Sequence, residues 1–202
     1  MKKKILITLL VLIPFISILL VVGFRGVIMP TNEEIVEELR DIKFYKTNAD
    51  YIFKNSRGEE KESTTQYYSR EDGVRVEFGE DLVKLYKDNK VEIIDNKSNT
   101  EYQLDGSMDI VYSLSFMKNI LSCPIIQGSM KEDQEEWGDV VYIQFDVEIF
   151  KDNDHLDSAR VFINKDTREP IGIVIYDKKG EITLTVIYED FEKMKEIDDN
   201  LL

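Results

Sequence analysis

The sequence predicts an α+β protein: a domain built mainly of antiparallel strands, placed behind an N-terminal membrane anchor. Residues 139–190 contain four runs in which apolar and polar side chains alternate, which is the pattern of half-buried strands. Residues 49–104 carry turn signals about every 8–12 residues, as in a meander of short strands. Residues 5–22 form an almost continuous apolar run. The first two observations predict the sheet, and the third predicts the anchor.

The N-terminal segment, residues 1–26, has the features of a transmembrane anchor. As a helix, its apolar run would span about 27 Å, close to the hydrocarbon thickness of a bilayer. Lys2, Lys3 and Lys4 precede the run, so the positive-inside rule places the N-terminus in the cytoplasm and the rest of the chain outside. We therefore expect a single-pass protein of the cell membrane that contacts the bilayer through residues 5–24. A cleaved secretory signal is the alternative, although the end of the run is a poor cleavage site.

A first helix of the domain is predicted from Thr31 to Lys43. Thr31 and Glu34 have the spacing of a capping box, in which each side chain binds the backbone N–H of the other residue. Three apolar residues then recur at helical spacing, namely Ile35, Leu39 and Ile42. We expect this apolar side to pack on the sheet.

Six short strands are predicted between residues 49 and 104. The first contains Tyr51 and Phe53, and the others cover residues 64–69, 74–78, 82–86, 91–94 and 100–104. Asp88 and Asn89 predict a tight hairpin between the fourth and fifth strands.

A second helix is predicted over residues 110–122, with Asp109 as its cap and Pro124 beyond its end. It is apolar on most sides, which is typical of a buried helix. The residues that recur at helical spacing are Ile110, Leu114, Met117 and Leu121. An acidic loop over residues 127–139 follows, and we expect its Trp137 to cover an edge of the core.

Four consecutive antiparallel strands are predicted near the C-terminus, over residues 141–149, 159–163, 171–175 and 182–188. Pro170 should open the third of these strands, because proline donates no hydrogen bond to a strand ladder. Residues 193–202 form an acidic tail.

Charge and composition exclude several function classes. The chain carries a formal charge of −14, and outside residues 1–26 it has 22 basic against 40 acidic residues, a charge of −18. Such a domain repels the phosphates of nucleic acids. Cys123 is the only cysteine, so no intrachain disulfide can form, and its apolar neighbours predict a buried thiol. His155 is the only histidine, which argues against a zinc site or a catalytic triad. We therefore expect no enzymatic activity, no catalytic residue, no cofactor and no metal.

A motif near the C-terminus resembles that of a known superfamily. Asp166-Thr167, Pro170, Asp177 and Gly180, followed by a strand, are similar to the C-terminal signature of the LolA/LolB lipoprotein carriers. With its acidic, lysine-rich composition, short single domain and N-terminal membrane segment, the chain further resembles clostridial germination lipoproteins of the GerS type. It departs from them in lacking a cysteine for lipidation after the apolar run.

The resemblance covers residues 31–192 and implies a LolA-like extracytoplasmic domain. Its fold would be a curved, open antiparallel β half-barrel with helices packed on the concave side. Proteins of the GerS type assist an N-acetylmuramoyl-L-alanine amidase that modifies the peptidoglycan of the spore cortex. The resemblance therefore implies an envelope protein required for germination, with a peptidoglycan amidase as its partner. Carriage or sensing of a lipid or lipoprotein acyl chain in the half-barrel is the alternative, a bare structural envelope protein is a third reading, and a homodimer is left open.

Overall fold

The computed structural model describes residues 12–20, 30–149, 153–198 and 200–202. The chain divides into two compact units, residues 1–37 and residues 38–202. Most of the predicted anchor lies outside the described residues, and its described part, residues 12–20, is helical. Among the described helices, none combines the length and the apolar character needed to cross a bilayer.

Helix α2 (Asn32–Arg40) begins with the predicted capping box. The Thr31 N–H donates to Glu34 Oε2 at 2.8 Å, and the Glu34 N–H donates to Thr31 Oγ1 at 3.2 Å. The helix ends at Arg40, three residues before the predicted end, because the chain enters the first strand at Phe44.

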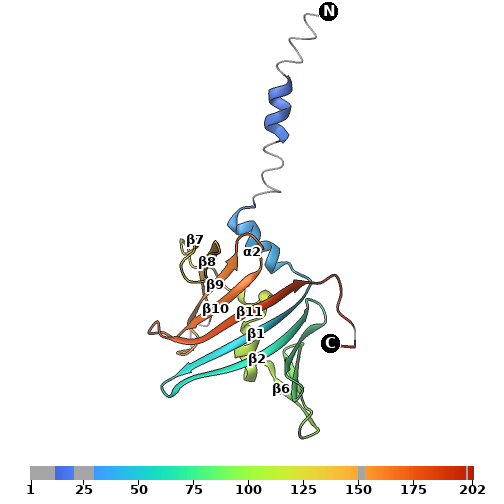
Figure 1. Ribbon diagram of the computed structural model, residues 1–202. Helices are drawn as coiled ribbons and strands as arrows, with labels where there is room; N and C mark the ends of the chain where they lie inside the picture. The colour runs from blue at the N-terminus through green and yellow to red at the C-terminus, as the bar shows by residue number, and fades with distance from the viewer. Residues whose placement is uncertain (1–11, 21–29, 150–152, 199) are drawn as a thin grey trace, which may run out of the picture. The chain divides into compact units, whose positions relative to one another are not determined.

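The described part of the second unit contains one sheet of eleven strands, and all of its pairings are antiparallel (Figure 1). The order across the sheet is β6-β5-β4-β3-β2-β1-β11-β10-β9-β8-β7. The bounds are β1 Phe44–Asn55, β2 Gly58–Ser69, β3 Gly73–Phe78, β4 Leu82–Lys87, β5 Lys90–Asp95, β6 Thr100–Asp105, β7 Lys131–Asp133, β8 Tyr142–Glu148, β9 Ser158–Asn164, β10 Pro170–Tyr176 and β11 Ile182–Lys193.

The predicted strands are confirmed in both halves of the sheet. Asp88 and Asn89 form the predicted tight turn between β4 and β5, and both have positive φ angles, 50° and 60°, as that class of hairpin turn requires. Pro170 opens β10 as predicted. The acidic loop contains one strand that was not predicted, β7, whose three residues are too few to show a periodicity.

The second helix is not continuous, which corrects the prediction. A 3-10 turn, η1 (Gly106–Asp109), is followed by α3 (Ile110–Leu114) and α4 (Met117–Ile120). Phe116 breaks the helix with an extended backbone, ψ 131°. Asp109 makes no capping hydrogen bond, because its carboxylate is already bound to Lys84 and Tyr86.

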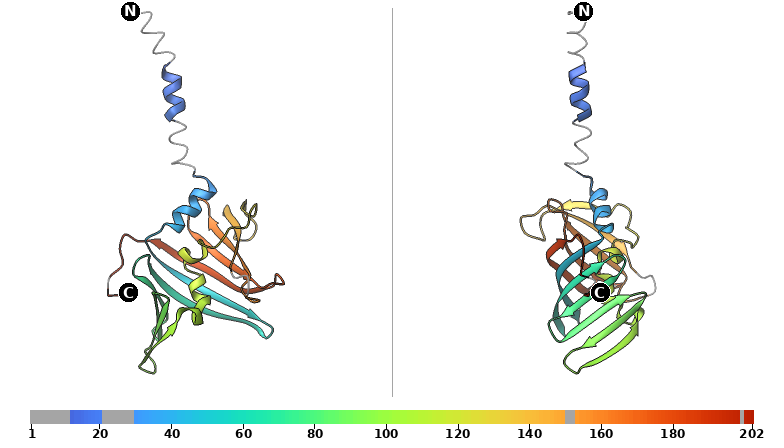
Figure 2. Two further views of the ribbon diagram at one scale, coloured as in Figure 1. Left: turned by 180° about the vertical axis from the view of Figure 1, so that it is seen from behind. Right: turned by 90° about the vertical axis from the view of Figure 1, so that its right-hand side faces the viewer.

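Residues 106–126, called here the helical segment, cross one face of the sheet (Figure 2). At its start, Asp109 accepts hydrogen bonds from β4, and at its end the Ile126 N–H donates to the carbonyl of Asp146 in β8 at 2.8 Å. β4 and β8 are separated by six strands in the sheet order, so the sheet curves around this segment. We call the face that holds the segment the concave face.

Trp137, which was predicted to cover an edge of the core, packs on the opposite, convex face of the sheet. It packs with Phe162, at 5.2 Å between ring centroids, and against Tyr142 and Val174. A side chain at Gly172 would lie 3.0 Å from the Trp137 ring and 2.7 Å from the Val186 carbonyl oxygen, so glycine leaves room for this cover.

Candidate partner-binding edge

Apolar side chains of the helical segment fill the concave face. Five of them are at most 4% exposed: Leu114, Phe116, Met117, Ile120 and Leu121. These side chains occupy the apolar space on the concave face that an acyl chain would need.

Buried hydroxyl groups attach the helical segment to the sheet. The hydroxyls of Tyr51 and Ser115 lie 2.6 Å apart, and Gln66 Nε2 donates to both, at 2.7 and 3.2 Å. Tyr188 donates to the Ser115 carbonyl, and Tyr45 accepts from the Met117 N–H at 3.4 Å. Burial raises the pKa of Tyr45, Tyr51 and Tyr188 above the ordinary tyrosine value, so these groups stay protonated and act as hydrogen-bond partners.

A second polar cluster fixes the start of the helical segment. Lys84 Nζ and the Tyr86 hydroxyl each lie 2.8 Å from Asp109 Oδ2, and Lys84 and Asp109 are both largely buried. Lys84 Nζ also lies 4.1 Å from the centroid of the Tyr112 ring. The opposite charges of Lys84 and Asp109 compensate each other, and the cluster holds the start of the helical segment on β4.

The single histidine and the single cysteine of the sequence lie in different surroundings. His155 lies in an exposed turn, where its backbone N–H binds Asn153 Oδ1. Cys123 is half-buried, not fully buried as predicted, because it lies past the end of α4; burial still raises the pKa of its thiol and favours the unreactive form. Within the described ranges, no three histidine, cysteine or acidic residues are grouped so that they could hold a metal ion.

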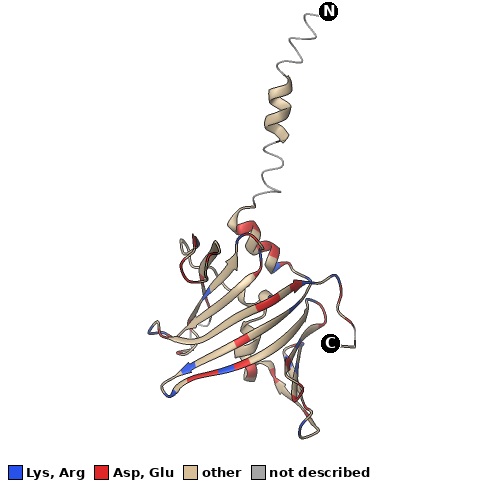
Figure 3. Cartoon of the chain, in the orientation of Figure 1, with Lys and Arg blue, Asp and Glu red and all other residues tan. Residues whose placement is uncertain are grey.

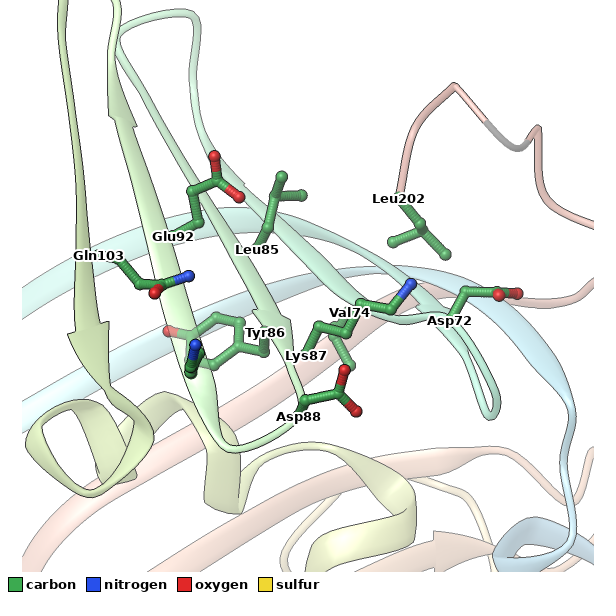
Figure 4. Close-up of a pocket in the computed structure, with 10 residues that line it drawn as sticks. Asp72, Val74, Leu85, Tyr86, Lys87, Asp88, Glu92, Gln103 and Leu202 are labelled. Atoms are coloured by element: carbon green, nitrogen blue, oxygen red, sulfur yellow. The ribbon is translucent and has the colours of Figure 1, made fainter.

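Two clefts flank the β4–β5 hairpin. The cleft in Figure 4 has a volume of about 300 Å³ and is lined by Leu85, Glu92 and Leu202, among others. A second cleft, of about 510 Å³, lies on the side of the helical segment, and Phe116 and Lys118 are among the residues that line it. Both linings mix charged and apolar groups, unlike the continuous apolar lining that an acyl chain favours.

The two edges of the sheet differ. At the C-terminal edge, β7 pairs with the first half of β8, while Ile125 forms a bridge to Val147 and the Glu148 N–H binds the Pro124 carbonyl at 3.0 Å. At the N-terminal edge, β6 pairs only with β5 among the described strands. Its outer backbone groups are therefore available to an added strand.

The β6 edge presents two chemically different faces. Tyr102 pairs with the buried Ile93 and lies on the concave face, yet it is 50% exposed. Glu92 and Glu101 lie diagonally across β5 and β6 on the convex face. The hydrogen bond and like charge of Glu101 raise the pKa of Glu92, and neither carboxylate has an ion pair among the described residues.

No binding residue is predicted from the sequence, and Glu92, Glu101 and Tyr102 stand out only once the strands are paired. The strands that carry them were predicted, and the four-residue turn between those strands would have placed the two glutamates on one face. What the sequence did not indicate is that β6 is the last strand of the sheet.

Comparison with known proteins agrees with the resemblance seen in the sequence. A family described as "Sporulation protein YdcC-like" matches residues 2–202. An uncharacterised conserved protein from Thermus thermophilus has the same fold, with a TM-score of 0.55 at 11% identity, covering 84% of this chain and 91% of that one.

Other structural matches carry the names of the superfamily and of the GerS type. A structure of the CwlD amidase in complex with the GerS lipoprotein, from Clostridioides difficile, matches at 20% identity and a TM-score of 0.48, covering 82% of this chain and 98% of that one. The LolA superfamily protein NE2245 from Nitrosomonas europaea matches at 11% identity and a TM-score of 0.41, covering 84% and 96%. No curated protein matches the sequence.

Proposed function

Because the chain belongs to the family of YdcC-like sporulation proteins, we propose that it is a non-enzymatic envelope protein of sporulation that acts by binding another protein. Family membership over residues 2–202 is the observation that carries this proposal. The packed concave face supports a binding partner over a lipid carrier, since Leu114, Met117, Ile120 and Leu121 occupy the space that an acyl chain would take.

The partner that we propose is a peptidoglycan amidase of the spore cortex. This choice rests on the resemblance of the Asp166 to Gly180 motif and of the chain's composition to GerS-type proteins. The N-terminal segment would hold the protein in the cell membrane, with residues 31–192 outside the cytoplasm. In that position the domain could meet an enzyme that acts on the cortex.

The open edge β6 is the surface through which we expect the partner to bind. An added strand would gain backbone hydrogen bonds along Thr100–Asp105 without any rearrangement of the core. Acidic residues are also spread over β2 and the end of β11 (Figure 3), so a partner with a basic surface would be favoured. That attraction should weaken in salt, because the Debye length falls from about 10 Å at 0.1 M to about 3 Å at 1 M.

A deletion strain tests the biological role. Its spores should have a cortex that lacks muramic-δ-lactam, and they should fail to germinate. A normal cortex in the deletion strain would remove the amidase proposal.

Purified components test the biochemical role. The full-length protein should bind the amidase of the same organism and should release no fragments from cortex peptidoglycan by itself. Cleavage of peptidoglycan by the protein alone would contradict a non-enzymatic role.

A further inference from the structure

We propose that the β6 edge accepts an extended segment of the partner in which basic and apolar side chains alternate. The inference rests on the proposed function for the existence of a protein partner, and it adds the chemistry of the segment that is bound.

The edge itself dictates an extended backbone. β6 (Thr100–Asp105) is six residues long and antiparallel to β5, and its outer side has no strand beside it in the described chain. At the other edge the last strand is β7 (Lys131–Asp133), which has only three residues, and residues 124–126 bind the rest of β8. Because β6 offers an open backbone twice as long as that of β7, it is where a strand from another chain would be added.

The convex face of this edge calls for basic side chains. Glu92 and Glu101 border a shallow hollow of about 300 Å³ together with Tyr102 and Gln103. The two carboxyl groups carry like charge on adjacent strands, where like charges are destabilising; the hydrogen bond with Glu101, desolvation and the charge of Glu101 together raise the pKa of Glu92. A lysine or arginine from an added strand would lie beside Glu101 and relieve this repulsion.

The concave face of the same edge calls for apolar side chains. Tyr102 is 50% exposed, and Met108, in the η1 turn that follows β6, is 70% exposed. Successive side chains of a strand point to opposite faces, so a strand that offers basic groups to Glu101 offers its alternate residues to the Tyr102 side. The partner segment should therefore alternate in character with a period of two.

The charge on the edge argues against a second copy of this chain as the occupant. Antiparallel pairing of β6 with β6 of another copy would bring Glu101 near Glu101 of that copy. Like charges on adjacent strands are destabilising. A basic partner strand has no such penalty.

Three labelled octapeptides provide the probes, tested against the full-length protein in a nonionic detergent. The first alternates lysine and valine, the second has the same composition with four lysines before four valines, and the third alternates glutamate and valine. Fluorescence anisotropy at 0.1 M salt should show the tightest binding for the first peptide. Hydrogen exchange should show protection of alternate amides in Thr100–Asp105.

A charge reversal locates the interaction. Glu101→Lys should weaken binding of the lysine–valine peptide by about three- to tenfold and should strengthen binding of the glutamate–valine peptide. Glu181→Lys makes the same change of charge at an exposed turn and should leave both affinities within about a factor of two. Tyr102→Ser should weaken binding of the lysine–valine alternating peptide, which should still bind more tightly than the other two peptides.

Several outcomes would overturn the inference. These are equal binding of the alternating and block peptides, equal effects of Glu101→Lys and Glu181→Lys, or concentration-dependent protection of β6 without peptide, which would make a second copy the occupant. The outcome is separable from that of the proposed function. If the amidase binds but Glu101→Lys has no effect, the amidase is the partner but does not bind at β6. If the peptides bind as expected but the amidase does not bind, β6 is a binding surface and the proposed partner is wrong.

Discussion

At the scale of single residues, Ser115 connects the helical segment to three strands. It lies where the helix is interrupted, with its hydroxyl beside Tyr51 and Gln66 and its carbonyl bound by Tyr188. The side chains of all four residues are buried. In a buried network of this kind, the loss of one hydrogen bond leaves a polar group unpaired at a cost in stability.

We predict that Ser115→Ala lowers the free energy of unfolding by about 1–3 kcal/mol, because the Tyr51 hydroxyl loses one of its two buried partners. Urea denaturation measures this change. Ser98→Ala removes an exposed hydroxyl that lies 2.7 Å from the Thr100 hydroxyl and should cost less than about 0.5 kcal/mol. Equal stability of the two variants would contradict a structural role for the buried network.

At the scale of elements, the helical segment is short and irregular but is a main part of the core. Leu114→Asp should cost about 3–5 kcal/mol, since it buries a charge without a partner. Thermal unfolding measures the loss. Ser122→Asp places the same charge on an exposed position of the same segment and serves as the control. A Leu114→Asp protein that melts like wild type would show that the segment is not part of the core.

The end of α2 is tied to the sheet by a shared carboxylate, which gives a pH-dependent contribution to stability. Lys193 Nζ lies 2.7 Å from Glu38 Oε1, and Arg168 Nη1 lies 3.3 Å from Glu38 Oε2. The hydrogen bond from Lys193, followed by the effect of Arg168, holds the pKa of Glu38 below its ordinary value of 4.5. The stabilisation is therefore complete above about pH 4.5 and is lost as the pH falls through the lowered value.

We predict that Glu38→Gln lowers the melting temperature by about 1–3 °C at pH 7, a small effect because the carboxylate is partly exposed. The difference from wild type should shrink as the pH is lowered from 5 to 3. Glu181→Gln, at an exposed turn, should show no such trend. A difference that stays constant down to pH 3 would rule out the ion pairs as its cause.

At the scale of the whole molecule, the charges around residues 5–22 predict the orientation in the membrane. A protease added to intact protoplasts should digest the domain and leave a short membrane-bound fragment, because three lysines keep the N-terminus inside. Immunoblotting of the two ends measures this. A protected domain would contradict the orientation, and a soluble protein that begins near residue 24 would contradict the uncleaved anchor.

The sequence by itself determined most of the strands and their turns. Alternation in β8 to β11 and the Asp88-Asn89 turn are local patterns, because strand periodicity and turn conformation depend on neighbouring residues. The capping box of α2 is equally local.

Only the tertiary structure decided where those elements meet. The sequence predicts Asp109 as a helix cap, but its carboxylate binds Lys84 and Tyr86 of β4 instead. The predicted helix is interrupted at Phe116. In the same way, nothing local in residues 100–105 indicates that β6 is the open edge, since that depends on β1 pairing with β11, more than 100 residues away in the chain. The physical reason is that a residue caps a helix only if its side chain has no other partner, and a strand is an edge only if no strand pairs with its outer side. Both conditions depend on long-range packing.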